Sequence, residues 1–96
     1  MEHGWLITRD YTADEYSNAK GVCGPSTTHY TPGDIKHHPD AREFRLLDDD
    51  GNLMARGLYV GDDGEDIFSP LDDYSEAMWG CTQIQYKNKH GEWETI

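Results

Sequence analysis

Alternating runs of apolar and polar residues recur along this chain and predict antiparallel β-strands. The first run is Trp5–Arg9, which is rich in residues with high strand propensity. The clearest signal is Arg42–Val60, where two such runs flank an aspartate-rich turn. A further pair, Cys81–Lys87 and Glu92–Ile96, is joined through His90-Gly91. These patterns predict a small antiparallel sheet of about five strands, made of an N-terminal strand and two hairpins.

The first hairpin turns at Asp48-Asp49-Asp50-Gly51, which suits a type I turn closed by glycine in the left-handed region. This turn pairs Asp48 with Asn52 and Leu46 with Met54. The register places Phe44, Leu46, Met54 and Leu58 on one face, and Leu47, Leu53 and Tyr59 on the other. Because both faces carry apolar residues, we expect both to be partly covered, one of them by a helix or by the long loop described below.

The second hairpin is predicted to be built like the first. With Gly91 in the left-handed region, Ile84 pairs with Ile96 and Lys87 pairs with Trp93. No linker divides the chain, and a length of 96 residues suits one domain. We therefore expect all 96 residues to form a single α+β domain with one or two short helices and a long loop.

Two segments carry helix-start signals. Thr12-Ala13-Asp14-Glu15 fits a capping box and predicts a surface helix of two turns that ends at Gly21. Ser69-Pro70 predicts a helix that ends at Gly80, with Ser69 as N-cap; an irregular loop is the alternative for this stretch. The apolar stripe of this helix would contain Leu71, Tyr74 and Met78, while Asp72, Asp73 and Glu76 would face water.

The segment Gly21–Pro39 is rich in Gly, Pro, Ser, Thr and His and predicts a long loop. Gly24-Pro25 and Pro32-Gly33 act as breakers of regular structure. Loops of this length in small domains are usually either functional or mobile. This segment is therefore the second place to look for activity.

The chain carries 19 acidic and 8 basic residues, a formal net charge of −11. Such an excess of negative charge argues against direct binding to nucleic acid or to an anionic membrane. It would steer basic partners toward the protein. The simpler explanation of the charge is that it keeps a small protein soluble. The N-terminal residues lack the features of a secretory signal, and no apolar run is long enough to cross a bilayer. We therefore expect a cytoplasmic protein with reduced thiols, with a Cys23–Cys81 disulfide as the open alternative.

Metal and catalytic sites find little support in the sequence. In an EF-hand loop starting at Asp48, the twelfth position would be Tyr59, which cannot supply the bidentate carboxylate. A zinc site would have to draw on residues without paired spacing, namely Cys23, His29, His37, His38 and Cys81. Neither cysteine stands in an activated-thiol motif, and acid pairs such as Asp72-Asp73 are expected on exposed surface. We expect no metal, no cofactor and no enzymatic activity.

The acidic residues between positions 48 and 76 are the candidate partner-binding site. Ten of them stand against the single base Arg56, while other bases cluster at Arg42 and Arg45 and at Lys87 and Lys89. If these segments share an edge, their carboxylates form a strip that a phosphate-binding groove would accept, which is the basis of nucleic-acid mimicry. The candidate residues are Asp48, Asp49, Asp50, Asp62, Asp63, Glu65, Asp66, Asp72, Asp73 and Glu76.

Three segments, Phe44–Gly51, Phe68–Asp73 and Gly80–Tyr86, resemble short proteins of phages and mobile elements that have no assigned function. The resemblance covers about the last half of the chain and transfers no catalytic residue. Small acidic phage proteins include anti-CRISPR and anti-restriction inhibitors, some of which occupy the DNA site of their target. The resemblance implies a phage or mobile-element neighbourhood. The ten-to-one excess of acidic over basic residues between positions 48 and 76 leads us to expect, within it, an inhibitor that binds a basic DNA- or RNA-binding protein, such as a CRISPR effector subunit, in the cytoplasm of a bacterial host.

The alternative is a non-enzymatic interaction module that binds through exposed aromatic side chains, with the charge serving only solubility. The candidate aromatic residues are Tyr30, Tyr74, Trp79 and Trp93. Binding by such a module would respond to alanine at an aromatic position and little to salt.

Overall fold

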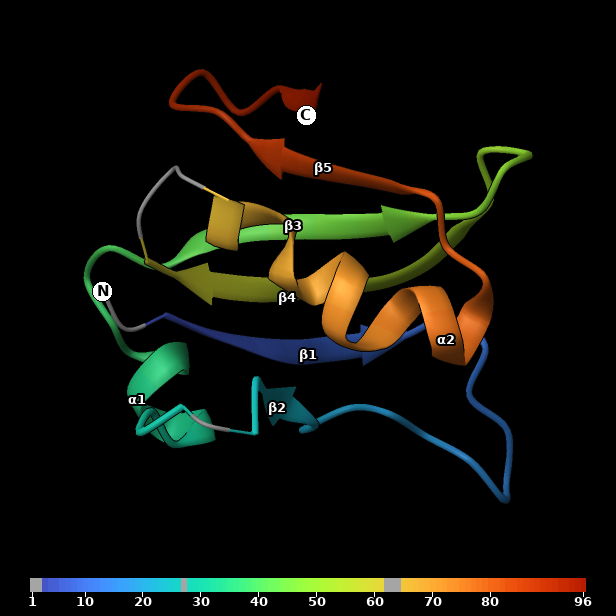
Figure 1. Cartoon of the computed structure of the whole chain (residues 1–96), viewed down its shortest axis with the longest axis horizontal. Helices are drawn as coiled ribbons and strands as arrows, with labels where there is room; N and C mark the ends of the chain where they lie inside the picture. Colours follow the sequence, from blue (N-terminus) through green and yellow to red (C-terminus); the bar gives the residue numbers. More distant parts are fainter. Residues whose placement is uncertain (1–2, 27, 62–64) are drawn as a thin grey trace.

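The computed structural model describes residues 3–26, 28–61 and 65–96 and shows an α+β fold built on one antiparallel sheet (Figure 1). The strands are ordered β2-β1-β4-β3-β5-β6. Their bounds are β1 (Gly4–Asp10), β2 (Cys23–Gly24), β3 (Arg42–Leu47), β4 (Leu53–Val60), β5 (Gln83–Lys87) and β6 (Trp93–Thr95). The helical elements are α1 (Pro32–Lys36), η1 (Glu65–Phe68), η2 (Leu71–Ser75) and α2 (Glu76–Trp79). The predicted fold class is confirmed, and β2 is the additional strand.

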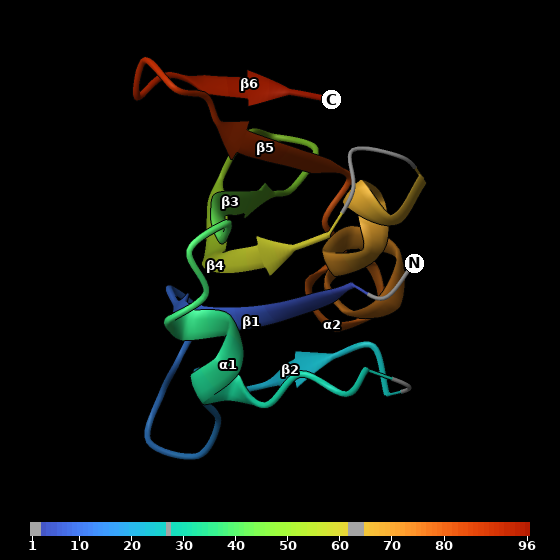
Figure 2. The ribbon, with the colours of Figure 1, turned by 90° about the vertical axis from the view of Figure 1, so that its left-hand side faces the viewer.

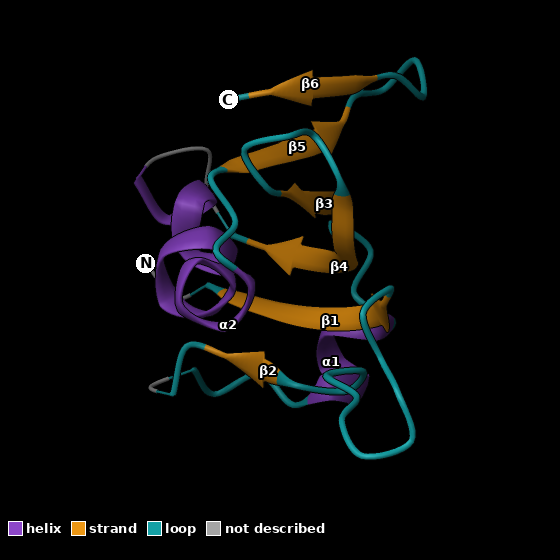
Figure 3. Cartoon of the chain, turned by 90° about the vertical axis from the view of Figure 1, so that its right-hand side faces the viewer, coloured by secondary structure: helices purple, strands orange, loops and turns teal. Residues whose placement is uncertain are grey.

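Both faces of the sheet are partly covered, as predicted, because neighbouring residues of each strand point to opposite sides. The elements η1, η2 and α2 form a helical layer over one face, and α1 lies on the other (Figures 2 and 3). Under the helical layer is the larger apolar cluster, made of Trp5, Ile7, Ala19, Phe44, Leu46, Ala55, Tyr59, Ile67, Cys81, Ile84 and Tyr86. Under α1 is a smaller cluster made of Leu6, Ile35 and Val60. Among the residues with described positions, no helix is long and apolar enough to span a membrane.

The first hairpin forms at the predicted turn but in a different register. Gly51 has a φ of 80°, and the Asp48 amide donates to the Asn52 carbonyl at 3.1 Å. A β-bulge then pairs Leu46 with Ala55 instead of Met54. Because a shift of one residue exchanges the two faces of a strand, Tyr59 lies beside Phe44 in the larger cluster, and Leu58 packs against the smaller one. The predicted faces of β4 were therefore wrong at Leu58 and Tyr59, whereas the turn was right and Met54 packs against the larger cluster as predicted.

The second hairpin is confirmed in detail. Lys87 pairs with Trp93, and the Ile96 amide donates to the Ile84 carbonyl at 3.4 Å. Gly91 has a φ of 81°, in the left-handed region that the predicted turn requires.

The helix predicted from Thr12 does not form. The Asp10 carboxylate accepts hydrogen bonds from the Thr12 amide at 2.8 Å and from the Thr12 hydroxyl at 2.6 Å, and Asp14 accepts from the amides of Tyr16 and Ser17. Side chains that bond nearby amides in this way favour turns over a helix. The segment also has little apolar surface to pack, with only Ala19 buried in the larger cluster. A short helix without an apolar face is marginal in water.

The predicted long loop contains more regular structure than expected. Cys23–Gly24 pairs with β1, and Pro32-Gly33, predicted to break structure, instead begin α1. The Thr31 hydroxyl accepts from the Asp34 amide, and the Asp34 carboxylate accepts from the Thr31 amide, which forms a capping box. Proline is favourable at the first helical position, so the same residue that breaks a strand starts this helix.

The helix predicted to end at Gly80 forms, but Ser69 is not its N-cap, since Ser69 is itself helical and its hydroxyl donates to the Asp73 carboxylate. A π-helical turn also changes the side that the helix buries. The Glu76 amide donates to the Leu71 carbonyl, five residues back. The extra residue in this turn rotates the following positions. Met78 is consequently 45% exposed, whereas Ser75 is fully buried. The predicted stripe was therefore wrong at Met78.

The Tyr86 hydroxyl ties the helical layer to the sheet by donating to the Ile67 carbonyl at 2.6 Å in the buried core. We expect Tyr86→Phe to lower the free energy of unfolding by about 1–2 kcal/mol, because the carbonyl loses this donor while ring packing is kept. Urea unfolding should show a lower midpoint with an unchanged slope. Tyr16→Phe, at a side chain that is 89% exposed, is the control. Equal midpoints for the two variants would contradict the expectation.

Candidate functional site: two oppositely charged faces

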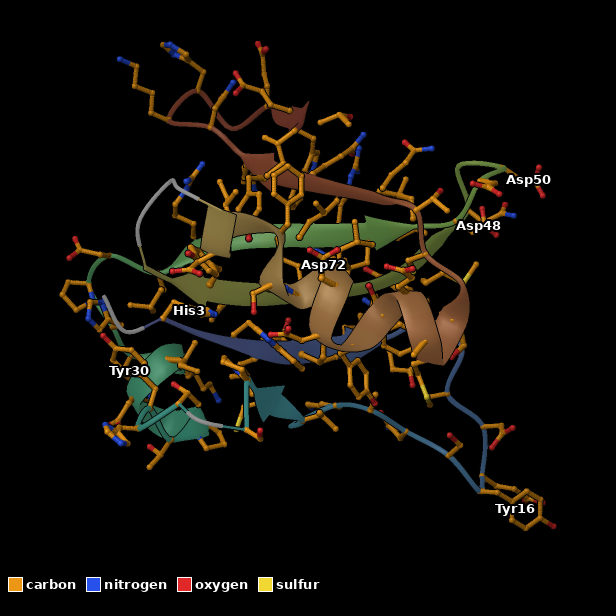
Figure 4. All side chains as sticks on the ribbon, viewed as in Figure 1. His3, Tyr16, Tyr30, Asp48, Asp50 and Asp72 are labelled. Atoms are coloured by element: carbon orange, nitrogen blue, oxygen red, sulfur yellow. The ribbon has the colours of Figure 1, made fainter. Side chains whose placement is uncertain are left out.

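The acidic candidate residues do not share one edge of the sheet. Asp48, Asp49 and Asp50 lie at the tip of the β3–β4 hairpin, while the connection that leads to Glu65 leaves the other end of β4 (Figure 4). At a rise of about 3.3 Å per residue, the eight residues of β4 place the hairpin tip roughly 25 Å from the Val60 end of the strand. Asp62 and Asp63 lie outside the described residues.

The helical layer holds the other acidic candidates. Residues 65–80 contain five acidic residues and no Lys, Arg or His. Asp72, Asp73 and Glu76 are exposed on this layer. The hairpin tip adjoins the chain that leaves α2, because the Thr82 amide donates to the Leu47 carbonyl at 3.0 Å. We call the tip and the layer together the acidic surface, made of Asp48, Asp49, Asp50, Asp66, Asp72, Asp73 and Glu76.

Asp48 shapes the hairpin turn as well as adding charge to it. Its carboxylate accepts from the Asn52 amide at 2.8 Å, the Asn52 side chain at 3.1 Å and the Asp50 amide at 3.0 Å. The bonds from the Asn52 amide and side chain lower the pKa of Asp48 and keep it ionised. Asp49 and Asp50 are exposed. Their charges are therefore the ones that can be removed without losing this set of turn bonds.

Ser69 and His3 form a network with two aspartates that the sequence does not reveal. His3 Nε2 lies 3.0 Å from Ser69 Oγ, and His3 Nδ1 lies 3.4 Å from an Asp66 oxygen (Figure 4 labels His3). The order Asp-His-Ser matches that of a hydrolase triad. The Ser69 hydroxyl, however, donates to the Asp73 carboxylate, and Ser69 is only 7% exposed. Its proton is directed away from His3, so the network joins the helical layer to the start of β1 and does not activate a nucleophile.

The zinc candidates lie in different parts of the fold. Cys23 packs against the smaller apolar cluster, and Cys81 is buried in the larger one, so the sheet stands between the two free thiols. Burial raises the pKa of the Cys81 thiol. His37 and His38 line an open pocket beside α1 together with His29. Within residues 3–26, 28–61 and 65–96, no three His, Cys, Asp or Glu side chains converge as metal ligands.

Basic residues gather on the sheet face opposite the helical layer. The strand register places Arg9 beside Arg56 and Arg56 beside Arg45, which forms a row across β1, β4 and β3. Neighbours in this arginine row stand on strands about 4.8 Å apart. Arg45 is paired in turn with Gln85 of β5, and Gln85 with Thr95 of β6.

Trp93 lies at the end of this face, surrounded by cations. The Arg45 guanidinium is 4.6 Å from the centre of the Trp93 ring, the Arg56 guanidinium 5.5 Å and the Lys87 ammonium 5.7 Å. Glu43 forms ion pairs with Arg56 at 3.2 Å and with Lys87 at 3.1 Å. We call the arginine row, Lys87, Trp93 and Glu43 together the basic face. It carries four cationic side chains and one carboxylate.

Comparison with protein-family models, curated proteins and solved structures finds no match to this chain. The two charged faces are therefore the features of this chain that bear on its function.

The aromatic candidates divide between core and surface. Tyr74 and Trp79 meet edge to face, with ring centres 5.4 Å apart, and pack against the larger cluster. The Trp79 indole donates to the Thr12 hydroxyl at 3.0 Å. Tyr30 packs beside α1 against the smaller cluster. Only Trp93 of the four candidates belongs to a charged face.

The basic face was missed because two β-bulges create it. With the predicted hairpin register, Arg56 would stand opposite Phe44 and point into the core side. The bulge after Leu46 pairs Arg56 with Arg45 instead, and an irregularity after Ile7 places Arg9 beside Arg56. The sequence shows three arginines within strand patterns, but such patterns do not indicate which of the two sheet faces each arginine occupies.

Proposed function

We propose that this protein is a non-enzymatic inhibitor that docks its acidic surface on the basic nucleic-acid-binding surface of a partner in a bacterial cytoplasm. The observation that carries the proposal is the helical layer, in which Asp66, Asp72, Asp73 and Glu76 supply four acidic side chains and none of the side chains that the structure describes is basic. A CRISPR effector or another defence complex is the partner class that the resemblance to phage proteins suggests. The carboxylates would occupy positions that phosphates take on the partner and so block its DNA binding.

The segregation of charge supports this proposal. The arginine row lies on the far side of the sheet, and the molecule is 21 Å across its shortest axis. The Debye length at physiological salt is about 8 Å, so the basic face is largely screened from a partner on the acidic side. A basic groove would therefore meet a nearly uniform negative field, which speeds encounter and fixes orientation.

Neutralising the exposed part of the acidic surface tests the proposal. The variant spares Asp48, Asp66 and Asp73, which make structural contacts, and combines Asp49→Asn, Asp50→Asn, Asp72→Asn and Glu76→Gln. An exposed ion pair contributes about 0.5 kcal/mol on average. Losing four such pairs should weaken binding by about 2 kcal/mol, which corresponds to roughly 30-fold weaker inhibition. The measurement is inhibition of DNA binding by purified defence complexes at 0.1 M salt and at higher salt, where the wild type should also weaken.

A control variant removes the same charge from other regions. It combines Glu15→Gln, Asp40→Asn, Glu92→Gln and Glu94→Gln. Inhibition that survives in the control and is lost in the acidic-surface variant supports docking through this surface. Equal losses in both would show that net charge alone matters, and full inhibition by the acidic-surface variant would refute the proposal. Binding that ignores salt and disappears in Trp93→Ala would favour the aromatic interaction module.

A further inference from the structure

The basic face is an unusual feature in a chain with a net charge of −11. Like charges on directly opposed strand positions are destabilising, yet Arg9, Arg56 and Arg45 occupy three such positions in succession. Aromatic rings accommodate them: Arg9 lies 4.6 Å from the centre of the Tyr11 ring, while Arg45 and Arg56 share Trp93. The side chains are thus held in an ordered array.

The array has the shape of a site for a chain of phosphates. From β1 through β4, β3 and β5 to β6, the row crosses four strand spacings of about 4.8 Å, which makes it roughly 19 Å long. Its donors are three guanidiniums. Arg45 Nε also donates to the Gln85 side-chain oxygen at 2.6 Å, and the Gln85 amide donates to the Thr95 hydroxyl at 2.9 Å, so hydrogen bonds hold this end of the row in place. Guanidinium groups match phosphate oxygens with paired donors. The length suits a site of about four nucleotides, at the short end for sheet-based single-strand binders.

The composition of this face fits nucleic acid better than an acidic protein segment. Protein interfaces are depleted of Lys, Glu and Asp at their centre but enriched in Arg, so arginines alone do not distinguish the two ligands. Here the centre is formed by charged side chains, with Arg45 and Arg56 between Arg9 and Trp93. An aromatic ring beside arginines is the arrangement on which unpaired bases stack. The α1 helix contacts β1 and β4 and does not extend over β6, the strand that carries Trp93 (Figure 2).

Net charge does not prevent such binding at physiological salt. At 0.1 M salt the Debye length is about 10 Å. The shortest axis of the molecule, along which the two faces are stacked, measures 21 Å (Figure 1). A strand on the basic face therefore interacts mainly with four cations and one carboxylate, not with the acidic layer behind the sheet.

From these observations we infer that the basic face binds single-stranded nucleic acid, with phosphates on the arginine row and a base on Trp93. This activity goes beyond the proposed inhibition and uses the opposite side of the molecule. One protein would then contact a basic protein surface and a nucleic acid at the same time.

Fluorescence anisotropy with a labelled 12-nucleotide oligothymidine at 0.1 M salt tests this inference. The double variant Arg45→Gln/Arg56→Gln is expected to bind at least tenfold more weakly. With three phosphate contacts, a plot of the logarithm of the binding constant against the logarithm of salt concentration should have a slope of about −2. In the double variant, which removes two of these contacts, the slope should be shallower by about 1.4. Trp93→Leu is expected to weaken binding about tenfold through lost stacking.

Arg42→Gln is the matched control, because Arg42 lies on β3 with Arg45 but over the Tyr86 ring on the other face. It should leave oligothymidine binding unchanged. Urea unfolding of each variant verifies that it is folded. The inference would be overturned if the wild type did not bind oligothymidine or if Arg42→Gln lost as much affinity as the double variant. Tighter binding to a 12-base-pair duplex than to oligothymidine would also overturn it. Equal competition by polyglutamate would also overturn it, since that would identify an acidic protein segment as the ligand.

The same variants separate the two proposals. Arg45→Gln/Arg56→Gln should retain inhibition of a defence complex, and the variant of the acidic surface should retain oligothymidine binding. Loss of one activity in both variants would mean that the two faces do not act independently.

Discussion

Gly57→Ala is expected to lower the free energy of unfolding by about 3 kcal/mol or more, the upper end for an overpacked core. A Cβ atom at this position would lie 2.2 Å from the Leu6 carbonyl oxygen and 2.4 Å from Cζ of Phe44. Neither neighbour can withdraw easily, because β4 stands between β1 and β3. In thermal unfolding, this loss corresponds to a decrease in midpoint of about 12 °C or more for a domain of this size.

Gly33→Ala provides the control for this substitution. Its Cβ atom would meet only the Thr31 hydroxyl at 3.9 Å, within α1. Alanine is favoured over glycine in a helix by about 0.5–1 kcal/mol, so this variant should be unchanged or slightly more stable. Similar losses in the two variants would mean that the close contact of β4 with Phe44 is not the cause.

Asp10→Ala is expected to lower the free energy of unfolding by about 2–3 kcal/mol, because hydrogen bonds to a charged group are among the stronger ones. The Asp10 carboxylate accepts from the Thr12 amide and hydroxyl and from the buried Ala19 amide at 2.9 Å. It thereby holds both ends of the segment that links β1 to β2. Asp14→Ala, which removes two turn bonds at an exposed site, should cost much less. Urea unfolding midpoints compare the two variants.

The contribution of Asp10 should also depend on pH. Burial by itself would raise the pKa of Asp10, but the bonds from the Thr12 hydroxyl and from the Ala19 and Thr12 amides outweigh burial and lower it. A carboxyl whose pKa is lowered by folding stabilises the protein above its unfolded value of about 3.9 and loses that contribution as pH falls through the folded value. The stability difference between wild type and Asp10→Asn should therefore be constant above about pH 5 and shrink in more acid solution. A difference that grew with acid would contradict this assignment.

The two charged faces give the molecule a polarity that its net charge hides. The helical layer presents Asp72, Asp73 and Glu76 to solvent, and the far side of the sheet presents the arginine row. A net charge describes behaviour at distances longer than the Debye length, whereas binding happens within it. For this reason the acidic surface and the basic face are assigned different ligands.

The amino-acid sequence by itself determined the elements whose signals are local. The turn at Gly51, the Lys87–Trp93 pairing and the helix end at Gly80 all follow from a glycine in the left-handed region beside a regular pattern. These features depend on a few neighbouring residues. The same local logic failed at Thr12, where the side chains of Asp10 and Asp14 bond turn amides and no apolar face favours a helix.

Only the tertiary structure decided which side each residue of β4 faces, and with it both candidate surfaces. One bulge moves Tyr59 into the larger cluster and Arg56 beside Arg45, and a π-helical turn moves Met78 from the core to the surface. Each change inserts a single residue, which leaves composition and pattern almost unaltered. In the strand the insertion reverses the direction of the following side chains, and in the helix it rotates them around the axis. Whether such an insertion is favourable depends on packing against strands and helices distant in sequence, and a local pattern contains no information about that packing.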